Sequence, residues 1–448
     1  MRKKFIAFLI IVLLGLNIQN GYAFANSMDN YVSIKLTNPI KSREIIKLYS
    51  DDGFNIYINS IFNDIEYIPN KNISIELNSI GEIEIKDEIG EILFSTHENN
   101  LILSSANKWD SIITVEDKRY RDFIKIQRES QSLLVINLID IEHYLYGVVP
   151  REMPASFPME ALKAQAVAAR TYTLNNLNKH GSEGYNLCDT THCQVYGGVD
   201  GEHTRTNEAV DSTKGIVITY NGSIIDAVYH SNSGGHTEDS AEAWGNYFPY
   251  LIGVEDEFSK NQPNSDWSFT IESSALNNKL KNNGIYIGDV VDLEIIETSP
   301  RGGVSKLKIV GTTGEEILNK GKIRQVLGND ELKSTWFSIK RGGPSTSISH
   351  VYAISGNSKN SQKIDPSKAI SIDKNNTKSY VRNSTVMGKD KRVKLIDIYK
   401  ENSNGFLIEG KGYGHGVGMS QWGAKKMAED GYTYDEILKH YYTGVEIN

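Results

Sequence analysis

The sequence predicts a β-rich α+β protein, in which a β scaffold, a central amphipathic helix and carboxyl-terminal helices form a groove. Three observations lead to this fold class. Short apolar segments with alternating character fill the first third of the chain. An alanine-rich run at 159–177 carries apolar residues at three- and four-residue steps. Two further helical patterns follow residue 420.

The amino terminus has the pattern of a secretory signal peptide. Three basic residues at positions 2–4 precede an apolar run at 5–16, and an A-x-A sequence ends at Ala25. This pattern predicts a cleavable signal over residues 1–25, and the run is short for a bilayer span. The alternative is an uncleaved anchor, which would be the chain's membrane contact. We expect the protein to work outside the cytoplasmic membrane.

Charge and cysteine content limit the classes of partner. The 448-residue chain has a formal net charge of −8, and removal of the three cations within residues 1–25 lowers it to about −11. An acidic chain does not bind nucleic acid through bulk electrostatics, so we expect no nucleic-acid partner. Two cysteines do not make a disulfide scaffold.

Residues 26–137 form the predicted amino-terminal β-rich region, which contains no cluster of titratable residues and is expected to be a scaffold. Its strand-like segments are 31–36, 45–49, 54–58, 73–77, 83–94, 101–103 and 133–138. The functional core is predicted at 138–340 and 405–448. A Ser-, Asn- and Lys-rich insertion at 341–404 divides these two parts and has little apolar surface to bury.

Glu152 is the predicted catalytic acid. It lies in the sequence GVVPREMP, where Pro150 and Pro154 disfavour helical conformation in the residues before them, so residues 149–154 are expected to be extended or turned. Pro158 fits the first turn of the following helix, and Lys179-His180-Gly181 is the expected end of that helix. A carboxyl group held by a rigid turn before a helix suits general acid catalysis. The alternative is a surface glutamate that stabilises the helix dipole.

The two cysteines and two nearby histidines predict a metal site. Cys188 and Cys193 lie five residues apart, His192 precedes the second cysteine, and His180 lies at the predicted helix end. Thiolate and imidazole ligands of this kind can close a tetrahedral zinc site, whose role would be structural. A disulfide in an oxidising compartment and a pair of free thiols are the alternatives.

A predicted hairpin leads into a polar loop that is a candidate for substrate binding. Asn221-Gly222 supplies the two positive φ angles of a type I′ turn between strands at 215–220 and 224–229. Loops at strand ends often carry binding residues because the scaffold fixes their base, although a solvated turn is the alternative. The candidates in this loop are His230, Ser231, Ser233, Gly234 and Gly235.

A glycine-rich run at 410–423 surrounds His415. Glycine at alternate positions permits unusual φ values or close backbone approach. His415 is therefore either a functional imidazole or a buried, hydrogen-bonded one. The run does not match the phosphate-binding patterns. A helix is expected at 421–429, and Thr433 with Glu436 predicts a capping box for a second helix.

Five sequence blocks together resemble the stage II sporulation protein D and amidase-enhancer (LytB-type) family. They occur in the family's order between about Asp140 and Gly444: GVVPREMP, ALKAQAVAARTY, CDTTHCQVYGG, YHSNSGGHT and GYGHGVGMSQWGA. The resemblance implies peptidoglycan as the substrate. Sporulation members are lytic transglycosylases that cut glycan strands stripped of stem peptides by a partner amidase. Amidase-enhancer members imply a different role, the stimulation of a separate cell-wall amidase.

The resemblance also implies residue roles. The family's catalytic glutamate falls on Glu152, which would act first as acid and then as base while 1,6-anhydro-muramic acid ends form. No second carboxylate is needed, unlike in paired-acid glycosidases. The metal ligands of some members fall on His180, Cys188, His192 and Cys193. Further candidates for the walls of the groove are Gln194, Tyr196, the loop at 230–235 and His415. The cleavable signal differs from the membrane anchor usual in sporulation members, which suggests a secreted vegetative paralogue.

Overall fold

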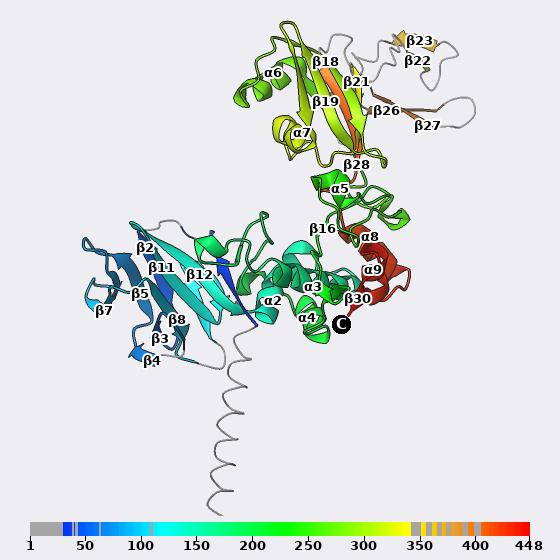
Figure 1. Cartoon of the computed structure of the whole chain (residues 1–448). Helices are drawn as coiled ribbons and strands as arrows, with labels where there is room; N and C mark the ends of the chain where they lie inside the picture. Colours follow the sequence, from blue (N-terminus) through cyan, green and yellow to red (C-terminus); the bar gives the residue numbers. More distant parts are fainter. Residues whose placement is uncertain are drawn as a thin grey trace, which may run out of the picture. The chain divides into compact units, whose positions relative to one another are not determined.

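The computed structural model of the chain contains two compact units, which are described separately (Figure 1). The first comprises residues 1–228 and 424–448, and the second comprises residues 229–423. The predicted boundaries at 138, 341 and 405 do not coincide with this division. The structure describes residues 30–37, 40, 44–61, 64–107, 111–341 and 405–448, and six short strands between 351 and 397. The predicted signal at 1–25 lies outside the described residues, as does most of the insertion.

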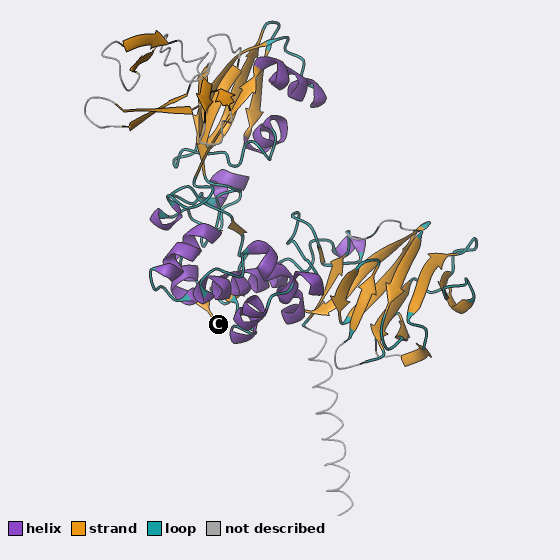
Figure 2. Ribbon diagram, turned by 180° about the vertical axis from the view of Figure 1, so that it is seen from behind, coloured by secondary structure: helices purple, strands orange, loops and turns teal. Residues whose placement is uncertain are grey.

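Two β-sheets form the amino-terminal part of the first unit (Figure 2). The seven-stranded sheet has the order β13-β1-β12-β11-β8-β3-β4, and the six-stranded sheet has the order β10-β9-β2-β5-β6-β7. The strands are β1 (Tyr31–Lys35), β2 (Ile45–Tyr49), β3 (Phe54–Ile58), β4 (Asp64–Ile68), β5 (Asn72–Leu77), β6 (Ile83–Lys86), β7 (Ile92–Thr96), β8 (Asn100–Ser105), β9 (Ile112–Val115), β10 (Lys118–Arg121), β11 (Phe123–Glu129), β12 (Ser132–Asp140) and β13 (Leu187–Cys188).

These strands confirm the predicted β-rich region and refine it. In β1 and β2 every second side chain is buried, as the alternating sequence predicts. The apolar run at 83–94 is two strands, because the turn Asp87–Gly90 divides β6 from β7. The charged strand β10 (KRYR) was not predicted, and it lies at a sheet edge where only one neighbour is needed.

Three helices follow the scaffold: α2 (Ile141–Glu152), α3 (Met159–Asn175) and α4 (Thr204–Ser212). The carboxylate of Asp140 caps α2 by accepting the backbone N–H of Glu142 at 2.8 Å. The predicted central helix α3 is confirmed, and most of its side chains are buried. Small alanine side chains on all its faces allow its neighbours to approach closely.

The prediction that residues 149–154 are extended or turned was wrong for residues 149–152. Val149 and Pro150 belong to the last turn of α2, and the backbone becomes extended only at Met153 (φ −127°, ψ 133°), the residue before Pro154. A proline in a last turn removes a single helical hydrogen bond. The buried face of α2, which includes Tyr144, Leu145 and Val148, offsets this loss.

The predicted end of α3 at Lys179–Gly181 is also wrong. The helix ends at Asn175, and the backbone N–H of Asn176 closes it by donating to the carbonyl oxygens of Tyr172 and Thr173. The amide of Asn176 also donates to the carbonyl oxygen of Tyr172, so this side chain supports the helix end. A short 3₁₀ helix at Gly181–Glu183 begins after His180.

A buried ion pair joins the helices of the first unit. The guanidinium of Arg170 in α3 binds both carboxylate oxygens of Glu142 in α2, at 2.9 and 2.6 Å. The two side chains are only 1% and 8% exposed. Arg170 also donates to the carbonyl oxygens of Val210 and Ile216, and Glu142 accepts the backbone N–H of Gly215. The pair therefore connects α2 and α3 to the chain that enters the next strand.

The carboxyl terminus completes the first unit. β14 (Ile218–Tyr220) and β15 (Ser223–Ile224) form the predicted hairpin, with φ values of 49° at Asn221 and 77° at Gly222. β30 (Glu446–Ile447) pairs with the other edge of β14. α8 (Gln421–Glu429) matches the predicted helix, and the predicted capping box begins α9 (Tyr434–Tyr441).

The second unit contains two three-stranded sheets around one hydrophobic core. The strand orders are β17-β28-β21 and β18-β19-β20. Its elements are β16 (Tyr229–His230), α5 (Ser240–Trp244), β17 (Asp266–Glu272), α6 (Ser273–Asn282), β18 (Val290–Thr298), β19 (Val304–Gly311), β20 (Glu315–Asn319), α7 (Lys320–Leu327), β21 (Phe337–Arg341), β28 (Gly405–Lys411) and β29 (Met419–Ser420). Three short hairpins lie between β21 and β28: β22 (Val351–Ile354) with β23 (Ser361–Ile364), β24 (Ile370–Ile372) with β25 (Lys378–Tyr380), and β26 (Asn383–Met387) with β27 (Val393–Asp397).

The fold is therefore α+β and rich in β structure, as predicted. Within the described part of the chain, no helix has both the length and the apolar character needed to span a membrane.

We predict that Arg170→Met strongly destabilises the first unit. Removal of one partner leaves a buried charge uncompensated, which costs about 3–5 kcal/mol. The measurement is urea unfolding followed by circular dichroism. The matched control is Lys163→Met, which breaks the partly exposed pair with Glu160 and is expected to cost less than about 1 kcal/mol. Equal losses in the two variants would contradict this role of Arg170.

Candidate functional site

Glu152 is the last residue of α2 and is partly exposed. One of its carboxylate oxygens faces the backbone N–H of Val195, with Oε1 and N at 3.4 Å. Its neighbour Arg151 packs beside Gly197 and Gly201, where an added Cβ would come within 2.5 and 3.2 Å of the guanidinium. The carboxyl group thus lies at the junction between the end of α2 and the segment at 195–201.

The side chain of Gln194 anchors this segment from within. Gln194 is 2% exposed, and its Oε1 accepts hydrogen bonds from Tyr144 in α2 (3.3 Å) and Thr173 in α3 (2.8 Å). Its amide nitrogen donates to the carbonyl oxygen of Ala169. The amide therefore holds the backbone beside Glu152 against both helices.

Tyr196 provides a second anchor. Its hydroxyl donates to Asn137 at 2.8 Å, and the side chain is 7% exposed. The ring lies against Gly147 of α2, where an added Cβ would come within 2.5 Å of it. Gly147 therefore permits the close approach of this segment to α2. Both Gln194 and Tyr196 are engaged within the protein, and their contact with a substrate stays a prediction.

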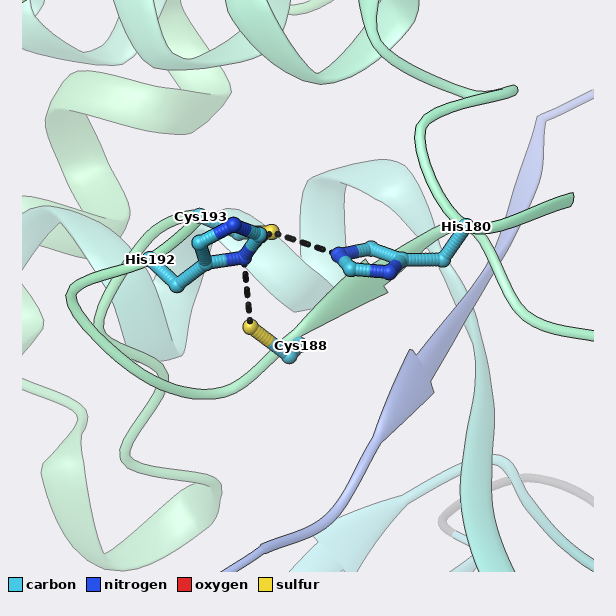
Figure 3. Close-up of side chains that lie close together, drawn as sticks. All are labelled: His180, Cys188, His192 and Cys193. Carbon is cyan, nitrogen blue, oxygen red and sulfur yellow. Dashed lines mark hydrogen bonds between the residues drawn. The ribbon is translucent and has the colours of Figure 1, made fainter. Parts of the chain in front are cut away.

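The four predicted metal ligands lie together in the first unit (Figure 3). Their donor atoms all lie within 4.8 Å of one another. Three of the four sulfur–nitrogen distances are 3.7 Å for Cys188–His192, 3.5 Å for Cys193–His180 and 3.6 Å for Cys193–His192. A tetrahedral zinc ion with bonds of about 2.3 Å to sulfur and 2.0 Å to nitrogen separates such atoms by about 3.6 Å. The donor set and its spacing therefore fit zinc.

Local structure explains how these ligands come together. Cys188 ends β13, which pairs with β1 through Lys35. The following loop is closed by hydrogen bonds from the backbone N–H of Cys193 to Thr190 and of Tyr196 to Asp189. This loop turns the second cysteine back toward the first. The two cysteines are not joined by a disulfide.

The surroundings of the cluster orient the ring of His180 and favour the neutral form of His192. Nδ1 of His180 lies 2.7 Å from a carboxylate oxygen of Glu183, which leaves Nε2 to face Cys193. A carboxylate behind a histidine orients the ring in many metal sites. The nearby ammonium group of Lys179 lowers the pKa of His192. A histidine must be neutral to bind a metal, so this shift favours the ligand form.

The remaining predicted site residues belong to the second unit. The parallel pairing of β16 with β29 places His230 opposite Ser420, and His415 lies in the glycine-rich run just before β29. The rings of the two histidines are 5.5 Å apart between centroids. The structure thus groups Glu152 with Gln194, and His230 with His415, in separate units.

Both histidine rings form hydrogen bonds with backbone groups. Nδ1 of His230 donates to the carbonyl oxygen of Val417 at 3.0 Å, while its buried Nε2 has no hydrogen-bond partner within the described residues. Nε2 of His415 donates to the carbonyl oxygen of Tyr229, and its Nδ1 accepts the N–H of Val417. Desolvation lowers the pKa of His230 to about 3 and that of His415 to about 4. Both are therefore neutral at pH 7.

The loop after His230 is mostly buried rather than open to solvent. Ser233 is 4% exposed and donates its hydroxyl proton to Asp256 at 2.7 Å. Gly234 and Gly235 have φ values of 74° and 115°, which favour glycine. Ser231 is partly exposed, and its carbonyl oxygen accepts the N–H of Trp422. The loop is an ordered connection, and its contact with substrate stays a prediction.

Sequence reasoning also missed two carboxylates, the partly buried Asp226 and the buried Glu238. Asp226 accepts a hydrogen bond from Asn176, and desolvation raises its pKa. Its position within the apolar run Ile224–Val228 was the available signal. Glu238 is 9% exposed; one oxygen binds Ser299 and Lys320, while Oε1 is buried without a hydrogen-bond partner in the described chain. No pattern in the sequence identifies Glu238, because its partners are distant along the chain.

We predict that acid destabilises the second unit through its two neutral histidines. Their folded-state pKa values lie below the ordinary value of 6.5, so the unfolded chain binds more protons as pH falls. Their stabilisation is complete above pH 6.5 and is lost as pH falls toward 4. At pH 4.5 the loss is about 2–3 kcal/mol for each imidazole.

Urea unfolding of the wild type and of His415→Gln between pH 7.5 and 4.5 measures this effect. The variant is expected to lose less stability over that range than the wild type. His97→Gln is the control, because His97 is 72% exposed. Identical pH dependence in wild type and His415→Gln would contradict the assignment.

Comparison with known proteins places this site in a family. Residues 129–220, which contain Glu152 and the four clustered ligands, match the family described as Stage II sporulation protein. Residues 244–358 match a second family, described as Domain of unknown function (DUF8618). The second match lies within the second unit.

Three relatives show how far the similarity extends. The amidase enhancer of Bacillus subtilis is 35% identical over 308 residues, which cover 68% of this chain but 40% of that protein. Stage II sporulation protein D of Bacillus amyloliquefaciens is 30% identical over 327 residues, or 69% of this chain and 74% of the relative. An uncharacterized protein of Brachyspira hyodysenteriae is 28% identical over 432 residues, which cover 95% and 94% of the two chains.

The sequence blocks quoted above, the matched region around Glu152 and these relatives agree with one another. This chain belongs to the stage II sporulation protein D and amidase-enhancer family.

Proposed function

We propose that the protein is an extracytoplasmic peptidoglycan lytic transglycosylase in which Glu152 is the catalytic acid and base. The observation that carries this proposal is the placement of Glu152. Its carboxyl group is partly exposed, yet it is fixed between the end of α2 and the segment that follows the metal-ligand cluster. A positioned carboxyl group of this kind is what proton transfer to a leaving group requires.

One carboxyl group is sufficient for the chemistry. The protonated Glu152 donates its proton to the glycosidic oxygen as the bond to the anomeric carbon breaks. The C6 hydroxyl of the same muramic acid residue then attacks that carbon and gives its proton to the Glu152 carboxylate. The acid is regenerated, no water is consumed, and the product ends in a 1,6-anhydro sugar. Hydrolysing glycosidases instead pair two carboxyl groups.

The buried ion pair and the two anchors support this role. Arg170 and Glu142 fix α2 against α3. Gln194 and Tyr196 fix the segment beside Glu152 against these two helices. Glu152 therefore has a defined position before substrate binds. Such preorganisation lowers the entropic cost of reaching the reactive geometry.

We further propose that His180, Cys188, His192 and Cys193 hold one zinc ion. The basis is the S₂N₂ donor set, in which three of the four sulfur–nitrogen distances are 3.5–3.7 Å and all donor atoms lie within 4.8 Å of one another. Four protein ligands close the coordination sphere, which is typical of structural rather than catalytic zinc. The metal would stabilise the loop that ends at Cys193. Of the next two residues, Gln194 accepts a hydrogen bond from Thr173 in α3, and the backbone N–H of Val195 faces the Glu152 carboxylate.

An activating role without cleavage is the second candidate function. It is supported by the relative named amidase enhancer, which this chain matches over 40% of that protein's length. In this case the protein would bind peptidoglycan and increase the activity of a cell-wall amidase. Secretion through the proposed signal at residues 1–25 is common to both candidates.

We predict that Glu152→Gln abolishes glycan cleavage while the protein stays folded. The amide keeps the size of the side chain but cannot donate an acidic proton, so the rate should fall by at least about 100-fold. Chromatography of soluble fragments released from purified glycan strands measures the rate, and circular dichroism checks folding.

Glu160→Gln is the matched control for this variant. Glu160 lies in the first turn of α3, is partly exposed, and accepts the backbone N–H of Tyr434, an interaction that glutamine can keep. Its activity should be close to that of the wild type. Cleavage by Glu152→Gln at the wild-type rate would remove Glu152 from the mechanism.

We predict one zinc ion per chain in the wild type and its loss in Cys188→Ser. Elemental analysis measures the metal, and thermal unfolding measures the stability that accompanies it. His97→Asn, a change at an exposed histidine outside the cluster, should keep the metal. Removal of the metal from the wild type with a chelator should lower its thermal stability as Cys188→Ser does, without a substitution.

A disulfide would give a different result. The intact mass would then be lower by two hydrogens, and no zinc would be found. That outcome would contradict the zinc proposal without affecting the proposal for Glu152.

A further inference from the structure

The sheet β17-β28-β21 of the second unit has one apolar and one polar face. Trp267 lies opposite Gly410, which lies opposite Phe337, and this row faces the hydrophobic core. Residues on either side of that row point the other way, because side chains alternate along a strand. The polar face therefore carries Asp266, Ser268, Ser338, Glu409 and Lys411, and Trp336, the residue before β21, lines the same depression as these five residues.

Trp336 is the single aromatic residue in this set, and its environment is unusual for a tryptophan. It is partly exposed, and the ammonium group of Lys411 lies 5.4 Å from its ring centroid. Within the described residues, its indole N–H has no hydrogen-bond acceptor. Beside that nitrogen lies Gly302, where an added Cβ would come within 2.8 Å. Glycine therefore keeps the space next to the indole N–H open.

A depression of about 570 Å³ lies over this part of the sheet. Trp336, Gly302, Asp266, Glu409 and Lys411 are among its lining residues. Its volume lies in the range of small-molecule sites, about 300–1,000 Å³, which is enough for more than one sugar ring. All its lining residues belong to the second unit, whereas Glu152 belongs to the first.

The polar groups of the depression suit a glycan. Asp266 and Ser268 are exposed, and Glu409 is partly exposed and paired with Lys340 at 2.5 Å. Carboxylates accept hydrogen bonds from sugar hydroxyl and N-acetyl N–H groups. An aromatic ring packs against the C–H face of a pyranose through its apolar surface. Lys411 supplies a cation for a carboxylate-bearing sugar.

We propose that this face of β17-β28-β21 is a non-catalytic binding site for an amino-sugar glycan strand, with Trp336 as its aromatic platform. The choice of an amino-sugar glycan rests on the proposed function, whereas the site itself rests on the residues above. The site would hold the strand on the second unit without contributing a group to bond cleavage.

Binding of chitotetraose, a soluble strand of N-acetylglucosamine, tests the proposal. Isothermal titration calorimetry is performed on the full chain with Glu152→Gln, so that no ligand is cleaved during the measurement. Addition of Trp336→Ala should raise Kd roughly tenfold or more, since the platform contributes stacking and an indole hydrogen bond. Tyr286→Ala is the matched control, because Tyr286 is a 76% exposed aromatic of the same unit and lies outside the depression.

A second variant separates binding from folding. Asp266→Asn combined with Glu409→Gln keeps side-chain volume and should also weaken binding, with an unchanged circular dichroism spectrum. Unchanged affinity in both Trp336→Ala and this double variant would overturn the proposal, as would binding of a stem peptide in place of the glycan.

The outcomes for this site and for the proposed activity are distinguishable. If the wild type does not cleave glycan but chitotetraose binding depends on Trp336, the binding site is supported and the transglycosylase proposal fails. If Glu152→Gln removes cleavage while Trp336→Ala and the Asp266→Asn, Glu409→Gln double variant both leave affinity unchanged, the binding site is overturned and the activity stands.

Discussion

The buried pair between Arg170 and Glu142 is the interaction on which the first unit depends. It joins α2 to α3 at 1% and 8% side-chain exposure, and it also binds backbone groups of the segment before β14. Burial of two charges is favourable only when nearly all their hydrogen-bonding capacity is used. That requirement fixes the helices in one arrangement, and Glu152 at the end of α2 is thereby fixed with them.

Local features of this fold could be predicted from the sequence. The alternating strands of the scaffold, the Asn221-Gly222 turn and the capping box at Thr433 each depend on residues close together in the chain. The metal-ligand cluster was predicted for the same reason, because three of its four residues lie within one short loop. Turn, cap and ligand chemistry over a few residues leaves a readable pattern.

Interactions between distant residues could not be predicted in this way. Residues 149–154 were expected to be extended or turned because of Pro150 and Pro154, but packing of α2 outweighed the loss of one hydrogen bond at Pro150. The ion pair of Arg170 spans 28 residues, and the polar face around Trp336 combines strands more than 140 residues apart. Such contacts depend on which strands and helices become neighbours, and a single sequence records no pattern for them.

The central claim is that Glu152 performs glycan cleavage without a second carboxyl group. Mass spectrometry of the ends produced from purified glycan strands, with and without stem peptides, tests it most directly. The account predicts 1,6-anhydro-muramic acid ends from the wild type and none from Glu152→Gln. Reducing ends would contradict it, because they require water and a second acidic group. The absence of any new end from either strand type would also contradict it and would favour the activating role.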